Sequence, residues 1–460
     1  MRRTDVKRQI CALAVVVLAA GCGGTTSTST PNPLDDKATP PAGQLELQFW
    51  HGFSAGANQD ATNYLVQQFN SQHSGQIHVT ATYAGNYDDT FAKYKAAIQS
   101  NQLPEIVQIY DIGTRFMIDS GTIQPMQVFI DHDKYNVSDL EPNLLGYFSI
   151  SNKLYSMPWN NSTPLLYYNK DAFQKAGLDP NKPPRTLAEI RDDAQKLTVK
   201  DSSGNVTQYG FGAAIYGWFL EQLTAQADQQ YCNNGNGRDK SATKVNLNQG
   251  TDVGIVDWWS KMVADGLAVN TGRNTTDAQN AFKAGKMAIT LESTGVMRGF
   301  QAAVKFQLGA GFFPKPTDTA TGGGTIIGGA SLWIVNKKPS YVQKAAWEFV
   351  KFLEQPQNMA YWHTHTGYFP VSKAAQSDPT DVAWRQQYPL FNVAIDQLHQ
   401  TKLDKATQGC LLGVMPATRQ AAEVGMEAAI TKKSAPQKAM DDAVATIQPQ
   451  IDQYNQAVGR

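Results

Sequence analysis

Hydrophobic and polar positions follow two different periods along the chain after residue 44. Three segments alternate every second residue or form short apolar runs, as strands do: 45–50, 77–84 and 105–111. Two segments between them repeat their apolar positions at helical spacing: 57–70 and 87–99. In the first helix we expect Ala61, Tyr64, Leu65 and Phe69 to share one face. This order predicts an α/β unit with a largely parallel sheet, which binds ligands at the carboxyl ends of its strands.

A second α/β unit follows. Its predicted strands are 165–169, 287–292 and 332–336, its predicted helices include 186–198 and 252–265, and the last third of the chain is mostly helical. We find no internal repeat. Roughly 415 residues after the N-terminal region exceed what one core accommodates, so we expect two domains.

The segment between Pro158 and Pro184 lies where one unit could pass to the other. It begins with a polar turn bounded by two prolines, and an apolar run (165–168) and a helix follow. Asn169 is a candidate cap for that helix, and Gly177 a candidate end. We interpret the polar part as a hinge or a ligand-binding strand.

The N-terminus predicts export. A basic start precedes an apolar run, 10–20, that is too short to span a bilayer. Small residues then precede Cys22, as in a lipoprotein signal; the alternative is an ordinary signal peptide with an incidental cysteine. Residues 22–44 are rich in Ser, Thr and Pro and read as a flexible tether. We expect the mature protein to be anchored through lipid on Cys22 at the outer face of the cell membrane.

Charge limits the classes of expected binding partner, and the cysteines limit the possible disulfides. The 40 basic and 40 acidic residues balance, and loss of residues 1–21, with four basic and one acidic residue, leaves about −3. No basic stripe remains, so nucleic acid is not an expected partner. In an oxidising compartment, Cys232 and Cys410 form either a disulfide or two free thiols.

Motifs of common enzymes are missing from the sequence. There is no G-x-S-x-G, no H-E-x-x-H and no phosphate-binding G-x-x-x-x-G-K-[ST], and the glycine-rich run 322–329 lacks the lysine that a nucleotide needs. His363 and His365 are close in sequence, but no third metal ligand is near them. We expect no cofactor, no metal and no enzymatic activity.

Several blocks resemble the glycerol-3-phosphate and glycerophosphodiester-binding family of solute-binding proteins of bacterial ABC importers. They are YAGNYDDT (83–90), IVQIYDIGT (106–114), WNNSTPLLYYNKDAFQKAGLDPNKPPRT (159–186), IIGGASLWIV (326–335), TGYFPVSKAA (366–375) and GVMPATR (413–419). The resemblance spans nearly all of the mature chain. It implies a two-lobe α/β fold of the type II periplasmic-binding-protein class, with a ligand cleft between discontinuous lobes.

The resemblance also implies the ligand contacts. Asp111 accepts hydrogen bonds from glycerol hydroxyls, Gly329 lets the backbone approach closely, and Arg419 supplies the cation for the phosphate. Hydroxyl donors and aromatic contacts complete the set: Tyr87, Ser162, Trp218, Ser293, Thr294 and Tyr368.

The chemistry of a phosphodiester fits these residue types. Its anionic oxygens favour a guanidinium with neutral donors, and vicinal hydroxyls favour a carboxylate acceptor. Because a carboxylate repels phosphate, we expect Asp111 and Arg419 at opposite ends of the ligand. Simpler roles remain open for these residues: Asp111 as a helix cap, Arg419 at the surface, the tyrosines in the core and Ser162 in a turn.

Two positions depart from the family pattern. Asp111 replaces a glutamate, and Ile215 replaces the first tryptophan of a W-x-x-W pair whose second aromatic residue is Trp218. We hypothesise that Ile215 enlarges the site for a head group such as choline, ethanolamine or inositol. Trp218, with Tyr87 or Tyr368, would then face a quaternary ammonium. The alternative is that Ile215 only repacks the core.

These observations predict a monomeric substrate-binding protein that delivers glycerophosphodiesters or sn-glycerol 3-phosphate to the permease subunits of an ABC importer. An oligosaccharide-binding protein of the same fold and a secreted phosphodiesterase are the alternatives. We expect lobe I to contain 45–160 and 295–336, and lobe II 161–294 and 337–460. The connections should lie near residues 160, 294 and 337.

Overall fold

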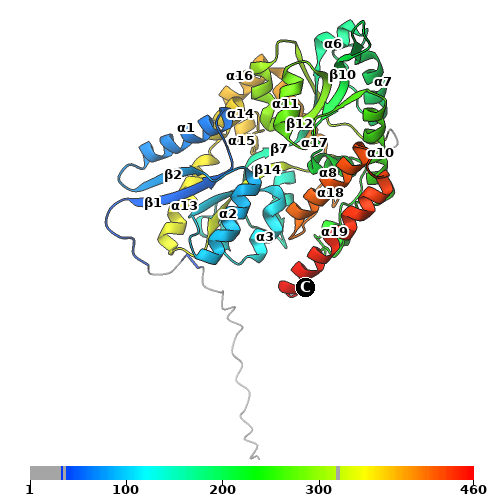
Figure 1. The fold of residues 1–460 in the computed structure, drawn as a ribbon. Coiled ribbons are helices and arrows are strands. Elements are labelled where there is room, and N and C mark those ends of the chain that lie inside the picture. The colour runs from blue at the N-terminus through cyan, green and yellow to red at the C-terminus, as the bar shows by residue number, and fades with distance from the viewer. Residues whose placement is uncertain (1–32, 35–37, 318–321) are drawn as a thin grey trace, which may run out of the picture. The chain divides into compact units, whose positions relative to one another are not determined.

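A computed structural model describes residues 33–34, 38–317 and 322–460. The predicted signal peptide and Cys22 lie outside the described residues. All elements below belong to one unit, residues 33–460, which contains two mixed sheets covered by helices (Figure 1).

The first sheet has the strand order β2-β1-β3-β14-β4, with β7 also paired to β14. The strands β1, β2 and β3 are parallel, and β14 runs antiparallel to its neighbours. In β1, buried Leu47 and Phe49 alternate with exposed Glu46 and Gln48, as the sequence pattern predicts. The strands are β1 (Leu45–His51), β2 (Ile77–Tyr83), β3 (Ile106–Tyr110), β4 (Ile123–Gln124), β7 (Met157–Ser162) and β14 (Gly328–Val335).

Helices from both ends of the chain cover this sheet. Near the N-terminal strands, α1 packs against α13 and α14, and α13 also contacts β1 and β14. These helices are α1 (Ala57–Gln72), α2 (Tyr87–Ser100), α3 (Thr114–Asp119), α4 (Met126–Asp133), α5 (Pro142–Phe148), α13 (Ser340–Leu353), α14 (Pro356–Thr366), α15 (Lys373–Gln376) and α16 (Pro379–Gln387).

The second sheet has the order β11-β10-β12-β8-β13, with β9 paired to β10. Here β10 is parallel to β11 and β12, whereas β8 is antiparallel to β12 and β13. The strands are β8 (Pro164–Asn169), β9 (Val199–Lys200), β10 (Val206–Ala213), β11 (Ala268–Asn270), β12 (Met287–Ser293) and β13 (Leu308–Phe312).

The C-terminal helices α18 and α19 lie side by side next to α8 and α10 (Figure 1). The helices of this half are α6 (Lys170–Lys175), α7 (Leu187–Leu197), α8 (Gly217–Gln226), α9 (Asn233–Asn236), α10 (Gly250–Ala264), α11 (Thr275–Lys283), α12 (Met297–Ala303), α17 (Asn392–Gln400), α18 (Met415–Ile430) and α19 (Pro436–Ala457). The remaining short elements are β5 (Ser149–Ile150), β6 (Lys153–Leu154), η1 (Asp111–Gly113), η2 (Thr294–Val296) and η3 (Pro389–Phe391).

The predicted strands and helices form, with ends that differ by a few residues. Asn169 caps α6 by accepting a hydrogen bond from Ala172 N. Tyr64 differs from the other three residues of its predicted face, which are buried: it is 41% exposed, and its ring stacks on Tyr361 at a centroid distance of 4.2 Å. An aromatic partner on α14 takes the place of the core there.

The predicted polar turn after Pro158 is also wrong, because this segment is the fully buried strand β7. Its asparagine side chains find partners inside the protein. Asn160 accepts a hydrogen bond from Gln108, and Asn161 donates one to the Gly328 carbonyl. The chain then passes from the first sheet to the second at Thr163, which is close to the predicted first connection.

The structure corrects two of the expected lobe assignments. Residues 308–312, expected in lobe I, form β13 and pair with β8 in the second sheet. Residues 340–366, expected in lobe II, form α13 and α14, which pack on the first sheet and on α1. The apolar face of a helix or strand can pack on either sheet. The order of elements in the sequence therefore does not reveal that β13 joins the second sheet or that α13 and α14 pack on the first.

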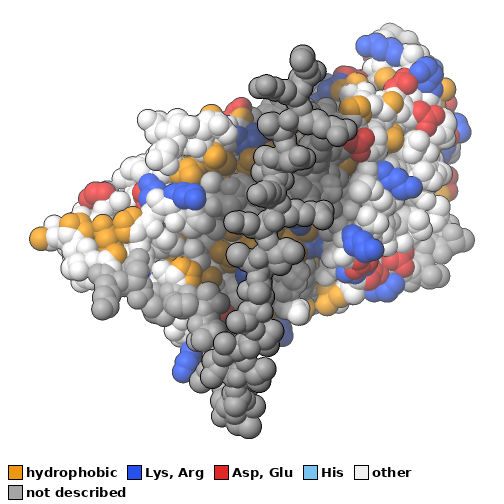
Figure 2. Space-filling model, turned by 90° about the horizontal axis from the view of Figure 1, so that it is seen from below, with side chains coloured by type: hydrophobic (Ala, Val, Ile, Leu, Met, Phe, Trp, Pro, Cys, Tyr) orange, Lys and Arg blue, Asp and Glu red, His pale blue; other side chains and the backbone are white. Residues whose placement is uncertain are grey.

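Cys232 and Cys410 form a disulfide with a Cα–Cα distance of 5.7 Å, so the structure contains the bonded form. It ties the segment after α8 to the segment before α18. On the face seen in Figure 2, basic and acidic side chains are interspersed where they are visible. Within the described residues, no helix combines the length and the apolar character needed to cross a bilayer.

Candidate ligand-binding site

A cavity of about 490 Å³ brings together residues from both sheets and from α2, α8 and α18. Eight of the predicted site residues line it: Tyr87, Asp111, Ser162, Trp218, Ser293, Gly329, Tyr368 and Arg419. The remaining wall consists of Asn86, Asp88, Tyr110, Tyr216, Arg273, Asn274, Thr275, Glu292 and Glu423. The cavity therefore combines guanidinium groups, carboxylates, hydroxyls and aromatic rings.

Strand ends and helix starts position these side chains. Asp111 follows the last residue of β3, Ser293 ends β12, and Ser162 ends β7. Tyr87 begins α2, whose start is fixed by a capping box between Asn86 and Asp89. The site thus lies where strands of both sheets end, as the α/β pattern predicts.

Arg419 is buried and bound on one edge by Glu221. Its Nε and Nη2 donate to the two carboxylate oxygens of Glu221 at 2.7 and 2.8 Å. Its Nη1 donates to Tyr216 Oη at 3.2 Å, and its Nη2 lies 3.6 Å from Asp111 Oδ2. The expected placement of Asp111 and Arg419 at opposite ends of the ligand is therefore wrong.

Burial and neighbouring charges set the protonation of this cluster. Burial raises the pKa of Asp111 to about 7, against the lowering effect of Arg419 and with a further rise from Glu221. Burial alone would lower the pKa of Arg419, but the charge of Glu221 and its other partners raise it well above its ordinary value. The guanidinium is thus permanently charged, whereas Asp111 titrates near neutral pH.

Two phenols meet in the cavity wall. Tyr87 Oη and Tyr368 Oη are 3.2 Å apart, and Asn160 Nδ2 donates to Tyr87 Oη at 2.8 Å. Gln108 holds Asn160 by donating to its Oδ1 at 2.8 Å, and accepts from Gly52 N at 2.7 Å. This chain of hydrogen bonds fixes the phenol oxygens in place, and Tyr368 is only 7% exposed.

Ile215 does not line the cavity. Its side chain is 1% exposed and belongs to the apolar core, while the next residue, Tyr216, faces the cavity. Tyr216 is extended, and successive side chains of an extended segment point to opposite sides. The hypothesis that Ile215 enlarges the site directly is therefore corrected: the aromatic side chains that line the cavity here are Tyr216 and Trp218.

Thr294 and Gly329 have structural roles that the sequence did not reveal. Thr294 is fully buried and holds the sheet crossing, since its N donates to Thr163 O and its Oγ1 accepts from Thr163 N. Gly329 has a φ of +82°, and a Cβ there would lie 2.0 Å from the Asn160 carbonyl oxygen. Gly329 lets β7 and β14 approach each other and also lines the cavity.

Five charged residues of the site were missed by the sequence analysis: Asp88, Glu221, Arg273, Glu292 and Glu423. Burial raises the pKa of Glu292 to about 7, and burial also raises that of Glu423. Four of them are close in sequence to predicted positions: Asp88 follows Tyr87, Glu292 precedes Ser293, and Glu221 and Glu423 each lie about one helical turn after Trp218 and Arg419. Arg273 has no such neighbour.

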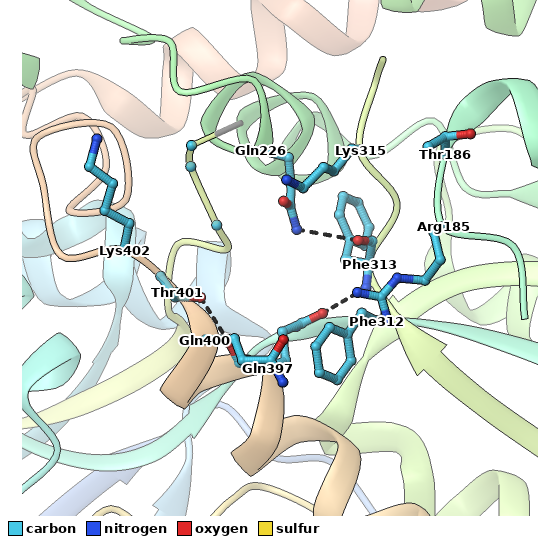
Figure 3. Close-up of a pocket in the computed structure, with 13 residues that line it drawn as sticks. Arg185, Thr186, Gln226, Phe312, Phe313, Lys315, Gln397, Gln400, Thr401 and Lys402 are labelled. Atoms are coloured by element: carbon cyan, nitrogen blue, oxygen red, sulfur yellow. Dashed lines mark hydrogen bonds between the residues drawn. The ribbon is translucent and has the colours of Figure 1, made fainter. Parts of the chain in front are cut away.

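Another cavity, of about 480 Å³, contains none of the predicted residues (Figure 3). Its lining includes three basic side chains, Arg185, Lys315 and Lys402, and two aromatic ones, Phe312 and Phe313. Lys402 is paired with Asp228 and Asp404. None of its lining residues lines the cavity described above.

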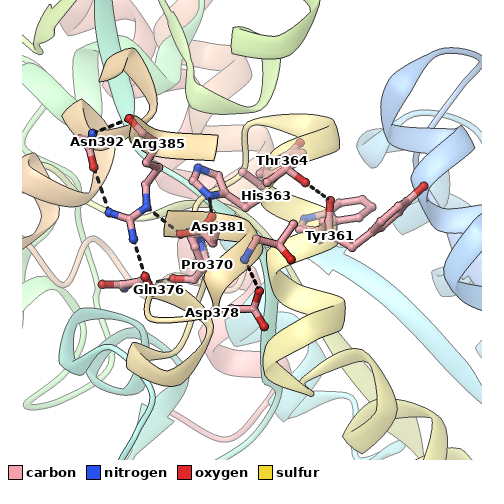
Figure 4. A network of polar contacts seen from close by, with 12 residues as sticks. Tyr361, His363, Thr364, Pro370, Gln376, Asp378, Asp381, Arg385 and Asn392 are labelled. Atoms are coloured by element: carbon pink, nitrogen blue, oxygen red, sulfur yellow. Dashed lines mark hydrogen bonds and ion pairs between the residues drawn. The ribbon is translucent and has the colours of Figure 1, made fainter. Parts of the chain in front are cut away.

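The two close histidines point to different partners. His363 is buried and contacts Asp381, which also accepts a hydrogen bond from Arg385 Nε at 2.6 Å (Figure 4). The ring of His365 stacks on Tyr361 at 3.9 Å. Among the described residues, no three His, Cys, Asp or Glu side chains cluster in a way that would hold a metal ion.

Comparison with known proteins identifies the family. The model of the bacterial extracellular solute-binding protein family matches residues 64–391. The sn-glycerol-3-phosphate-binding periplasmic protein UgpB of Yersinia enterocolitica is 34% identical over 406 residues, which cover 87% of this chain and 91% of that protein. The chain belongs to the bacterial extracellular solute-binding protein family. Proteins of this family bind solutes and are not enzymes, so the phosphodiesterase alternative is not supported.

Solved structures of solute-binding proteins share the fold. UgpB from Mycobacterium tuberculosis in complex with glycerophosphocholine superposes with a TM-score of 0.75 at 23% identity, over 89% of this chain and 99% of that one. The cyclic alpha-maltosyl-1,6-maltose binding protein from Arthrobacter globiformis gives 0.70 at 20% identity, over 88% and 98%. The expected two-lobe fold is confirmed.

Proposed function

We propose that this protein is the substrate-binding component of an ABC importer and captures glycerophosphodiesters, glycerophosphocholine among them, or sn-glycerol 3-phosphate. Relatives that are named for binding sn-glycerol 3-phosphate support this assignment. So does the structural neighbour in complex with glycerophosphocholine. The ligand would pass unchanged to permease subunits of the importer.

The observation that carries the proposal is the buried guanidinium of Arg419 in a cavity with hydroxyl and phenol donors. Ser162, Ser293, Tyr87 and Tyr368 line the same cavity. A phosphate needs a cation and neutral donors, and this cavity offers both. Asp111 beside the guanidinium offers an acceptor for glycerol hydroxyls, so phosphate and glycerol would bind close to the same cluster.

The charge of the wall favours a zwitterion over a plain anion. Four acidic side chains, from Asp88, Asp111, Glu292 and Glu423, line the cavity together with two guanidinium groups, and above neutral pH, where Asp111 and Glu292 lose their protons, the acidic groups outnumber the basic ones. A phosphodiester with a cationic head group places its positive end near the carboxylates. Tyr216 and Trp218 add aromatic surface for a quaternary ammonium.

An oligosaccharide is the second candidate, and a specific observation favours it: the same cavity offers several aromatic rings together with carboxylates, and Arg419 is already paired with Glu221. The two candidates differ in whether they need the guanidinium.

Replacement of the ion pair separates the candidates. The double substitution Arg419→Met and Glu221→Met removes both charges, which a buried site tolerates better than loss of one partner. For a phosphodiester we expect a loss of about 1.5–3 kcal/mol in binding free energy, measured by calorimetry. Unchanged binding of glycerophosphocholine by the double variant would contradict the proposal, and unchanged binding of maltose alone would favour the sugar.

We also propose that the protein is exported, anchored through Cys22 and monomeric. The sequence before residue 45 supports export and anchoring, and the relatives are named as periplasmic proteins. Mass spectrometry of the membrane fraction tests the anchor, because a diacylated Cys22 would be the first residue of the mature chain.

A further inference from the structure

The charge of Arg419 is balanced before a ligand arrives. Glu221 accepts from its Nε and Nη2, and Asp111 Oδ2 lies 3.6 Å from the same Nη2. A phosphate that approaches this cluster therefore meets no excess of positive charge. A second guanidinium near this cluster would strengthen the binding of a phosphate there.

Arg273 is the other basic residue among those that line the cavity. Its Nη2 is paired with Glu427 on α18. Its Nε is buried and makes no hydrogen bond in the structure. Since a guanidinium offers five N–H donors, a single carboxylate contact leaves donors available for a ligand.

The surroundings of Arg273 also suit an anion. Asn274 and Thr275, which follow it, line the cavity and begin α11, where Asn274 caps the helix. The start of a helix carries partial positive charge. Both Arg273 and Arg419 also lower the pKa of Glu423, against the raising effect of its burial, so the two guanidinium groups act on one region of the cavity.

We propose that Arg273 is a second phosphate-binding guanidinium of this cleft and favours phosphomonoesters more strongly than phosphodiesters. The inference rests on the proposed function. Near pH 8 a monoester carries close to two negative charges and a diester one. A second guanidinium therefore stabilises the monoester more, and Arg273 sets how well sn-glycerol 3-phosphate competes with glycerophosphodiesters.

Arg191 provides a matched control. It is paired through Nη2 with Asp265, and its side chain is 33% exposed, compared with 36% for Arg273. It does not line the cavity. Because each substitution to glutamine removes one half-exposed ion pair, both variants should lose similar, small amounts of stability.

The test is calorimetry at pH 8 with sn-glycerol 3-phosphate and glycerophosphocholine, on the wild-type protein, Arg273→Gln and Arg191→Gln. We expect Arg273→Gln to weaken binding of the monoester about tenfold and that of the diester about threefold, as for lost hydrogen bonds to a charged group. Arg191→Gln should change neither. Arg273→Lys, which keeps the charge, should recover part of the monoester affinity.

The inference is overturned if Arg273→Gln matches Arg191→Gln for every phosphate ligand that the wild type binds, or if both ligands lose affinity equally. If the wild type binds neither ligand, the proposed function itself is contradicted, independently of Arg273. The two failures are thus distinguishable in one data set.

Discussion

The guanidinium of Arg419 lies between two carboxylates, and this arrangement decides what the cleft can bind. Glu221 on α8 holds the Nε–Nη2 edge, and Asp111, directly after β3, lies 3.6 Å from the same Nη2. All three side chains are at least 94% buried. Ion pairs at such depth gain little net stability, because burial of the charges offsets their attraction. We therefore interpret Glu221 and Asp111 as residues that orient the guanidinium of Arg419.

Glu221→Gln tests this role. Loss of the carboxylate leaves a buried guanidinium with a weaker counter-charge, so we expect the free energy of unfolding to fall by about 3 kcal/mol. An anionic ligand would supply the missing charge. Glycerophosphocholine should therefore raise the melting temperature of this variant more than that of the wild type, as measured by a thermal-shift assay.

Unchanged stability of Glu221→Gln without ligand would show that Glu221 does not support Arg419. A smaller ligand-induced rise than in the wild type would contradict the counter-charge argument. Both outcomes are readable in the same assay.

The resemblance of short sequence blocks predicted eight of the residues that line the cavity, but not how they are arranged. Asp111, Ser162 and Arg419 were found because each lies in a recognisable block. Glu221 lies 198 residues before Arg419 in the sequence, and no motif marks it. Because nothing in the sequence pairs Glu221 with Arg419, chemistry alone predicted the wrong separation of Asp111 and Arg419.

At the scale of elements, α8 and α10 are joined by a buried polar contact between Thr224 and Asp252. The Thr224 hydroxyl also contacts the Leu220 carbonyl at 2.7 Å. A hydroxyl has one proton, so it donates to only one of these acceptors. Burial raises the pKa of Asp252 to about 7, against the lowering effect of its contact with Thr224. When Asp252 is protonated, it donates to Thr224 while Thr224 donates to Leu220.

Asp252→Asn should therefore stabilise the protein at high pH. The folded-state pKa, near 7, exceeds the ordinary value of 3.8, so the native state binds more protons between these values. The stability of the wild type should fall across this window as pH rises, relative to the variant. We expect the melting temperature of Asp252→Asn to exceed that of the wild type by more at pH 8 than at pH 5.

Asp257→Asn is the control for this prediction. It lies in the same helix, with its side chain 42% exposed and paired with Lys261. Its effect should be similar at both pH values. A constant difference for Asp252→Asn across the pH range would contradict the assignment of a protonated Asp252.

Alternating patterns predicted strands and helices well where one face is buried. They failed at β7, where buried asparagines mimic a polar turn because their partners come from Gln108, Tyr87 and Gly328. Tyr64 shows the opposite case: it shares an apolar helix face in the sequence pattern, but its ring packs on Tyr361 at the surface. In both cases, contacts with distant segments of the chain decide whether the side chain is buried or exposed.

At the scale of the whole molecule, the site draws on both sheets. Asp111 and Ser162 come with the first sheet, and Ser293 and Arg419 with the second sheet and its helices. A ligand that contacts both groups stabilises the arrangement in which they are close, in proportion to its differential affinity. The number of lobes was predictable from length and pattern. The pairing of β13 with the second sheet and the packing of α13 on the first sheet were not.

Calorimetric titration of the wild-type protein shows whether the cleft binds phosphate esters. Glycerophosphocholine, sn-glycerol 3-phosphate and maltose are titrated separately under the same conditions. We expect saturable binding of glycerophosphocholine or sn-glycerol 3-phosphate and none of maltose. Saturable binding of maltose without binding of either phosphate ligand would contradict it.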